Sequence, residues 1–101
     1  MWKVADALPA DVETLLHLGW GLGSYRFARY RKPNRAPAQL LATPSAEVRD
    51  VVTASLRVRD WVNTPTEDMG PQQLEDAARA LADAHGAQLE VITGDALLAQ
   101  N

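Results

Sequence analysis

The stretch that decides the fold lies at residues 58–71, which read VRDWVNTPTEDMGP. Asn63 can close a helix, because asparagine tolerates the left-handed backbone found at helix C-termini. Pro65 cannot extend that helix, and it holds the residue before it in an extended conformation. Pro71 can open a new helix at its first position, where the missing N–H group costs nothing. The stretch therefore predicts a junction between two helices.

The helix before this junction is predicted over residues 44–62. Thr43 is a suitable N-terminal cap and Pro44 a suitable first residue. Apolar and small residues recur at spacings of four, three and four, which places them on one face of a helix. We expect this face to be buried; it consists of Val51, Ser55, Val58 and Val62, and Val48 and Val52 widen it.

The helix after the junction is predicted over residues 71–85. Glu75 and Arg79 are four residues apart and can form an ion pair on its outer side. Gly86 is a strong stop signal. Residues 88–93 then read as a strand, and a short helix is expected over 96–100. The buried stripe of the longer helix is predicted to consist of Leu74, Ala77, Ala78, Leu81 and His85.

The N-terminal part is predicted to hold a helix over residues 11–30, capped by Asp11, and a short strand over 39–43. Glycines at positions 19, 21 and 23 each lower the helix propensity. We interpret them as sites where another backbone approaches closely, with a break of the helix near residues 21–23 as the alternative. The whole chain is thus expected to be α/β and rich in helix.

Composition narrows the class of protein. The chain has 101 residues, 47% of them hydrophobic, a net charge of -3 and no cysteine. Disulfides and thiolate zinc sites are thereby excluded, and the acidic balance argues against a nucleic-acid partner. No apolar run approaches the length of a membrane span, and the first six residues contain no apolar h-region, so we expect no signal peptide. We therefore expect no membrane partner and a cytoplasmic location.

Residues 59–65, RDWVNTP, and the following Gly70-Pro71 resemble the leucyl aminopeptidase (cytosol aminopeptidase) family, whose members carry Arg-Asp, an apolar pair, Asn-x-Pro and then a helix-opening proline. Residues 18–27 resemble the last helical part of the family's N-terminal domain. The resemblance covers most of the chain. It implies that residues 1–43 end an N-terminal α/β domain, 44–64 form an interdomain helix, and 65–101 begin the catalytic α/β domain.

The resemblance also implies an activity. Family members are two-metal exopeptidases that remove N-terminal residues from peptides, use zinc or manganese, and are commonly hexamers. Their metal ligands and their catalytic Lys and Arg lie downstream of this junction. We therefore expect this chain to be a fragment, with no catalytic, cofactor-binding or metal-binding residue of its own and no activity alone. The rival interpretation is a non-catalytic helical module for protein interaction.

Two histidines and an acidic pair are the candidate ligands. His17 and His85 are the only histidines, and neither stands in a zinc-binding spacing, so a structural role is favoured for both. Glu67 and Asp68 can form a cation or amine site near the junction. Support of the following helix through its dipole is the preferred interpretation.

Two further segments match no complete motif, but each has a functional interpretation. Residues 19–24, GWGLGS, lack the third glycine and the preceding strand of a dinucleotide-binding loop. Residues 25–32, YRFARYRK, interleave aromatics with cations as single-strand binders do. A solvated helix end with its aromatics packed inward is favoured there; contact with a partner subunit, or anion binding through residues 26–35, stays open. Ser24 and Thr64 have no recognisable base for a nucleophilic role.

Overall fold

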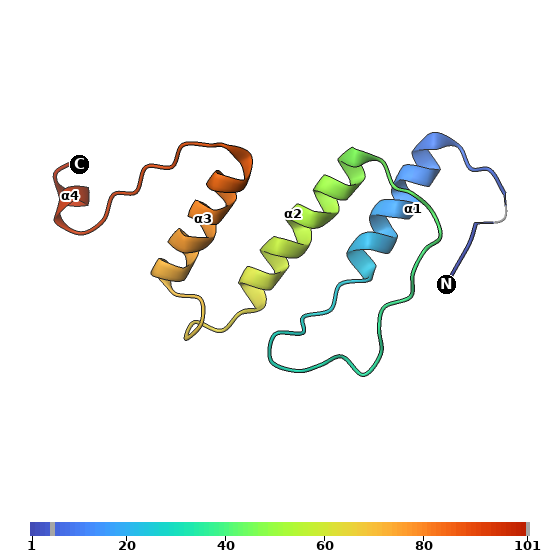
Figure 1. Ribbon diagram of the computed structural model, residues 1–101, viewed down its shortest axis with the longest axis horizontal. Coiled ribbons are helices and arrows are strands. Elements are labelled where there is room, and N and C mark those ends of the chain that lie inside the picture. The colour runs from blue at the N-terminus through green and yellow to red at the C-terminus, as the bar shows by residue number, and fades with distance from the viewer. Residues whose placement is uncertain (5, 101) are drawn as a thin grey trace. The chain divides into compact units, whose positions relative to one another are not determined.

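The computed structural model describes residues 1–4 and 6–100. In chain order its helices are α1 (Ala10–Gly23), α2 (Ala46–Asn63), α3 (Pro71–His85) and α4 (Asp95–Leu98), shown in Figure 1. The chain forms two compact units, Met1–Asn63 and Thr64–Asn101. The first unit holds α1 and α2, and the second holds α3 and α4. The assignment of segments to domains of a larger protein stays a prediction.

The expected richness in helix is confirmed, but neither predicted strand is. At residues 39–43 the described chain has only one parallel bridge, between Trp2 and Leu40. The Trp2 N–H donates to the Gln39 carbonyl at 2.8 Å, and the Leu41 N–H donates to the Trp2 carbonyl at 2.7 Å. Residues 88–93 are not a strand in the described structure. A strand exists only where a neighbour takes up its backbone hydrogen bonds, and these segments have almost none.

The first helix is shorter than predicted, because α1 ends at Gly23 and does not reach residue 30. Ser24 closes it: its N–H donates to the Trp20 carbonyl at 2.9 Å, and its hydroxyl donates to the Gly21 carbonyl at 2.9 Å. The helix therefore ends near residues 21–23, as one interpretation of the glycines predicts, and the close approach of another segment that the other interpretation predicts is found at Gly21 but not at Gly19 or Gly23. At the other end, Asp11 lies in the first turn and does not cap the helix, which follows Pro9.

The ends of α2 are capped differently from the prediction. The helix begins at Ala46, and the Ser45 hydroxyl accepts the Val48 N–H at 3.3 Å, so Ser45 takes the capping place expected of Thr43. Asn63 ends the helix as predicted, but its backbone is not left-handed, since no described residue other than glycine has a positive φ. Its side chain has a different use, described below.

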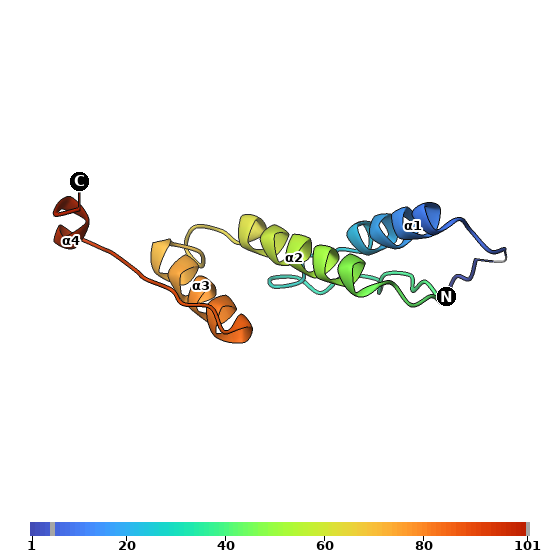
Figure 2. The same cartoon turned by 90° about the horizontal axis from the view of Figure 1, so that it is seen from above.

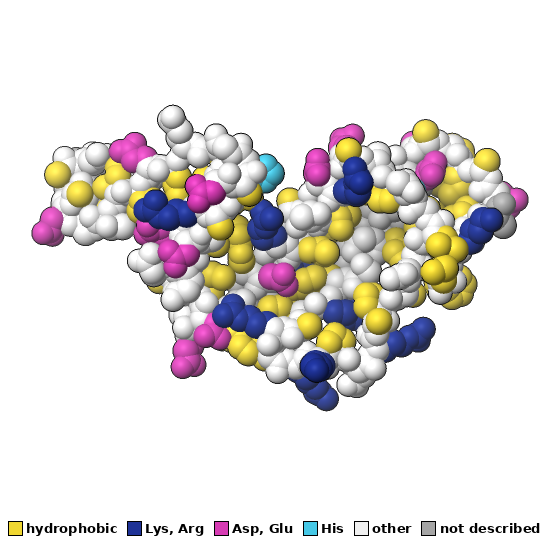
Figure 3. Space-filling view, in the orientation of Figure 1, with side chains coloured by type: hydrophobic (Ala, Val, Ile, Leu, Met, Phe, Trp, Pro, Cys, Tyr) yellow, Lys and Arg dark blue, Asp and Glu magenta, His cyan; other side chains and the backbone are white. Residues whose placement is uncertain are grey.

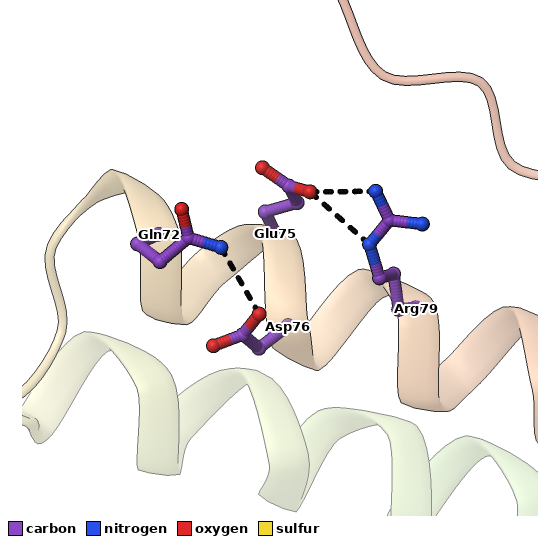
Figure 4. Close-up of polar contacts among 4 residues, drawn as sticks. All are labelled: Gln72, Glu75, Asp76 and Arg79. Atoms are coloured by element: carbon purple, nitrogen blue, oxygen red, sulfur yellow. Dashed lines mark hydrogen bonds and ion pairs between the residues drawn. The ribbon is translucent and has the colours of Figure 1, made fainter.

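The bounds of α3 are confirmed at both ends. Pro71 is its first residue, and the Gln73 side-chain oxygen accepts the Gly70 N–H at 3.0 Å. Gly86 terminates the helix with a left-handed backbone, φ 64°. The predicted pair on the outer face is present, with Arg79 Nη2 and Nε at 2.7 and 3.1 Å from Glu75 Oε1, and Figure 4 shows it beside the Gln72–Asp76 hydrogen bond. Exposed pairs of this kind stabilise a helix by only a few tenths of a kcal/mol.

The second unit has a small buried centre. Ala82 of α3 is buried, and Ala77, Ala78 and Leu81 are half-buried. The ends of the predicted stripe are wrong, because Leu74 and His85 are exposed. The second unit is small, and only the middle of the predicted stripe is removed from solvent. In the extended segment that follows the helix, the half-buried residues are Val91 and Ile92.

In the first unit, α1 and α2 run side by side and in the same direction, as Figures 1 and 2 both show. Residues 24–45 return from the end of α1 to the start of α2. His17 of α1 and Val48 of α2 are the buried residues of this pair. A Cβ atom on Gly21 would lie 2.7 Å from Cγ2 and 2.9 Å from Cγ1 of Val52. The two helices are therefore in contact at this glycine.

α1 covers only one edge of the predicted face of α2, the edge formed by Val48 and Val52. Val48 is buried and Val52 lies against Gly21 of α1. By contrast, Val51, Val58 and Val62 are 46%, 52% and 77% exposed. Successive residues in a helix are turned by 100°, so Val48 and Val52 point to a different sector from Val51 and Val58. The periodicity identifies an apolar face correctly, but it does not determine which sector the neighbouring helix covers.

The contact at Gly21 gives a matched pair of glycine substitutions. Gly21→Ala would push a methyl group into the stiff, β-branched Val52 side chain, and we expect a loss of about 1–2 kcal/mol in the free energy of unfolding. Gly19 lies in the same helix with nothing within 4 Å of its Cβ position. Gly19→Ala should therefore stabilise by up to about 1 kcal/mol through helix propensity. Urea denaturation followed by circular dichroism measures both; equal effects of the two substitutions would contradict the packing.

Candidate functional site

The two histidines lie in different units, His17 in the first and His85 in the second. His17 is buried in α1, and its Nε2 atom has no hydrogen-bond partner in the described part of the chain. His85 is the last residue of α3 and is exposed. Its position at a helix C-terminus is one where a cation is favoured by the helix dipole.

The residues present do not match the metal centre that the family resemblance implies. Two-metal hydrolases hold their ions with several converging carboxylate or imidazole groups. Within residues 1–4 and 6–100, no group of three or more His, Cys, Asp or Glu side chains lies close enough together to hold one metal ion. The described residues thus do not fit a two-metal centre.

The acidic pair lies in the turn between α2 and α3. The N–H groups of Asp68 and Met69 both donate to the Pro65 carbonyl at 2.9 Å, which folds residues 65–69 into a tight turn. Glu67 is exposed on this turn and Asp68 is half-buried. Both acids precede Gly70, where α3 is capped. Their role as electrostatic support for that helix stays a prediction.

The two segments with superficial motifs have different structures. Residues 19–23 lie within α1, so their backbone is helical and does not form a loop. Residues 25–32 lie beyond the end of α1 and are irregular, which contradicts the expected helix end. The Ser24 hydroxyl is engaged with the Gly21 carbonyl, and Thr64 is buried at the start of the second unit.

The best-defined polar cluster joins the end of α1 to the end of α2, and we call it the clamp: Leu22, Tyr25, Arg59, Asp60 and Asn63. Arg59 Nη1 donates to the Leu22 carbonyl at 2.7 Å. The Tyr25 hydroxyl donates to Asp60 Oδ1 at 2.8 Å and accepts from Asn63 Nδ2 at 3.1 Å. The Arg59 guanidinium carbon lies 5.5 Å from the centre of the Tyr25 ring.

Helical geometry explains why these residues converge. Arg59 and Asn63 are four residues apart, and Asp60 and Asn63 are three apart, so all three reach out from the same side of the last turns of α2. Arg59 satisfies a carbonyl in the last turn of α1, where no further helical N–H is available and a cation is favoured. The stretch that carries the family resemblance is therefore the stretch that holds α1 and α2 together.

The electrostatics of Tyr25 fit a structural role. Its partial burial, with the hydrogen bond to and the negative charge of Asp60, raises the pKa of the phenol above its ordinary value; the Asn63 hydrogen bond and the Arg59 charge act in the opposite direction. The phenol stays protonated at neutral pH and keeps donating to Asp60. A hydroxyl with a raised pKa is a poor nucleophile, so the geometry favours a role for Tyr25 in holding α1 and α2 in position over a role as a nucleophile.

The clamp is not among the features that the sequence alone predicts. Residues 59–65 form a recognisable motif, but the sequence predicts for Asn63 only a backbone role in ending the helix, and no role for its side chain. Tyr25 is recognisable only as one of the aromatic residues in the basic run 25–32. The available signal is the i, i+1, i+4 spacing of three polar residues in the last turns of α2. Their partner, Tyr25, is 35 residues from Asp60 in the sequence, and no local pattern identifies it.

None of the helices that the structure describes combines the length and the apolar character needed to cross a bilayer. This finding concerns residues 1–4 and 6–100 alone.

The sequence is similar to proteins named probable cytosol aminopeptidase. It is 31% identical to the one from Mycobacterium sp. strain JLS over 95% of this chain and 22% of that protein. It is 33% identical to the one from Streptomyces avermitilis over 94% of this chain and 23% of that protein. It is 35% identical to the one from Mycobacterium bovis strain BCG Pasteur over 87% of this chain and 19% of that protein.

The predicted resemblance to the leucyl aminopeptidase (cytosol aminopeptidase) family is thereby confirmed. The chain spans about a fifth of the length of these relatives. No protein-family model matches the sequence. No solved structure matches it either.

The clamp predicts unequal effects for two arginines of α2. Arg59→Met removes the hydrogen bond to Leu22 and the contact with the Tyr25 ring, and should lower the free energy of unfolding by about 1 kcal/mol. Arg57→Met is the matched control, because Arg57 is exposed and has no hydrogen bond or ion pair among the described residues. Its effect should stay within about 0.5 kcal/mol. Chemical denaturation measures both, and equal losses would contradict the clamp.

The raised pKa of Tyr25 predicts a pH dependence. Because the folded protein favours the neutral phenol, the clamp's contribution to stability is complete below about pH 10, the ordinary tyrosine pKa, and is lost as pH rises through the folded pKa. In a Tyr30→Phe background, absorbance at alkaline pH should show Tyr25 titrating above its ordinary value. Asp60→Asn removes the negative charge and should shift that titration to lower pH; an unchanged midpoint would rule out the contact.

Proposed function

We propose that this chain is a non-catalytic, positioning segment of a leucyl aminopeptidase-like exopeptidase, and that it links the end of an N-terminal domain to the start of a catalytic domain. The single observation that carries the proposal is the similarity of 31% over 95% of this chain to only 22% of a probable cytosol aminopeptidase. The stretch with the recognised motif, residues 59–65, forms the clamp between α1 and α2, which suits a linking segment.

For the whole protein we propose the activity that the family resemblance implies. It would remove N-terminal residues from peptides in the cytoplasm, as a homo-oligomer, with two divalent metals such as zinc or manganese. Bound metals of this kind polarise the scissile carbonyl and activate a water. The described residues do not fit that centre, so the chemistry is assigned to residues outside this chain. What this chain contributes is the fixed geometry of two helices and the turn that follows them.

The exposed apolar side chains support a place within a larger protein. Val51, Val58 and Val62 lie on one face of α2 and are all exposed, although the helix spacing is that of a buried face. Residues 88–93 are rich in apolar, β-branched residues yet lack a strand partner in the described structure. A self-contained interaction module is the alternative, and the Val51 face would then dock a partner.

The proposal predicts that the purified chain alone has no peptidase activity. Cleavage of leucine-p-nitroanilide should be indistinguishable from buffer with zinc or manganese added, because the ligands for two metals are assigned to other parts of the protein. The complete probable cytosol aminopeptidase of Mycobacterium tuberculosis, which is 34% identical over 87% of this chain, serves as the positive control. Metal-dependent cleavage of leucine-p-nitroanilide by the chain itself would contradict the proposal.

A chimera distinguishes the two candidate functions, a segment of an aminopeptidase and a self-contained interaction module. In it, this chain replaces the matching segment of the Mycobacterium tuberculosis relative, and we expect activity to be retained. Val58→Asp should then lower the activity at least tenfold, because it places a charge on an apolar face that is covered in the whole protein. Thr53→Asp, on the far side of α2, is the matched control and should have little effect. Equal activity of the two variants would favour the independent module.

A further inference from the structure

Cations and acids are unevenly distributed along this chain. Five of its ten Lys and Arg residues lie within residues 24–38, here called the basic loop: Arg26, Arg29, Arg31, Lys32 and Arg35. No Asp or Glu occurs between Glu13 and Glu47. Because the whole chain has a net charge of -3 and the loop contributes +5, the rest of the chain carries -8. A net charge taken over the whole chain therefore hides a strongly basic segment.

The structure leaves most of these cations available to a partner. The loop is irregular, since α1 ends at Gly23, and its Lys and Arg side chains gather along one part of the first unit in Figure 3. Arg26 Nη1 donates to the Tyr25 carbonyl at 2.7 Å. Among the described residues, Arg31, Lys32 and Arg35 form no hydrogen bond or ion pair. Their charge is not neutralised by a neighbouring carboxylate.

An aromatic platform lies in the same loop. Tyr30 is 53% exposed, and its ring packs edge-to-face with Phe27 at 5.8 Å between centroids. The Arg29 guanidinium carbon lies 5.6 Å from the Tyr30 ring centre. Beside these residues, a hollow of about 460 Å³ is lined by Arg26, Asn34 and Arg35 together with prolines and alanines. The loop thus combines a half-exposed aromatic ring, one arginine over that ring and a hollow lined by two arginines.

These observations remove both reasons for expecting no nucleic acid here. The first is that residues 25–32 would be a helix end with aromatics packed inward, whereas the loop is not helical and Tyr30 is exposed. The second is the acidic balance of the chain, which is carried by other segments. In water at physiological salt, charges more than about 8 Å apart are largely screened, so a net charge summed over the whole chain does not describe the field at the loop.

We propose that the basic loop binds single-stranded nucleic acid, with its arginines on the phosphates and Tyr30 stacked on a base. Arginine recognises phosphate through paired N–H groups, and an aromatic ring stacks on any base. An acidic peptide would use the cations equally well, but it would make no use of the aromatic character of the half-exposed Tyr30 side chain. A flexible single strand can follow an irregular loop, and its unpaired bases are free to stack on an aromatic ring.

Fluorescence anisotropy of the complete chain with a labelled twenty-nucleotide oligo-dT tests the proposal. With three to five cations on phosphates, the affinity should fall about 20- to 100-fold between 50 and 200 mM NaCl. The double variant Lys32→Glu, Arg35→Glu should abolish binding at 50 mM NaCl. Arg57→Glu, which reverses a single charge on the exposed surface of α2, should keep the wild-type affinity within a factor of about 3. Circular dichroism verifies that every variant is folded.

The stacking contribution is tested separately. Tyr30→Leu keeps an apolar side chain and all cations but loses the ring, and should weaken oligo-dT binding at least about fivefold. An oligo-glutamate peptide of twenty residues probes the acidic-protein alternative. The proposal is overturned by no binding of oligo-dT at 50 mM NaCl, by equal loss in the Arg57→Glu control, by unchanged affinity of Tyr30→Leu, or by oligo-glutamate binding as tightly. None of these outcomes bears on the peptidase proposal, whose readout is peptide cleavage.

Discussion

The arrangement of the first unit depends on the absence of a side chain at residue 21. Val52 occupies the space where a Cβ atom on Gly21 would lie, so α1 and α2 can approach closely at that level. Only with this approach can Arg59 reach the Leu22 carbonyl and Asp60 reach the Tyr25 hydroxyl. The glycine contact and the clamp therefore support each other: one sets the distance between the helices and the other fixes their ends.

The features that the sequence predicts best are those whose signals are local. The bounds of α3 follow from Pro71 at one end and Gly86 at the other, two residues whose backbone preferences act within a single turn. The end of α1 is harder to predict, because three glycines and Ser24 have to outweigh an apolar pattern that continues to Tyr30. The strands could not be predicted reliably, since pairing depends on distant segments that no local pattern specifies. The clamp escapes prediction for the same reason, because Tyr25 meets α2 only after the chain has folded.

In this chain the polar residues of the motif make contacts between the end of α2 and the preceding segment. Arg59, Asp60 and Asn63 belong to the stretch that identifies the family, yet their hydrogen bonds go to a backbone carbonyl and a tyrosine hydroxyl. Polar residues in a recognisable motif are readily taken for catalytic groups. Here their spacing on one side of a helix and the engagement of each in a contact with the preceding segment explain their presence by positioning alone.

Charge and apolar surface divide between different parts of the first unit. The apolar face of Val51, Val58 and Val62 lies on α2, whereas the basic loop connects the end of α1 to the start of α2 and carries no acid. An apolar face requires a closely fitting partner surface, because only the apolar area removed from water contributes to the free energy of binding. A basic loop requires only opposite charge within a screening length. The two surfaces thus make different demands on a partner, and one chain can present both, with its helices covered by a larger protein while the loop between them stays in contact with solvent.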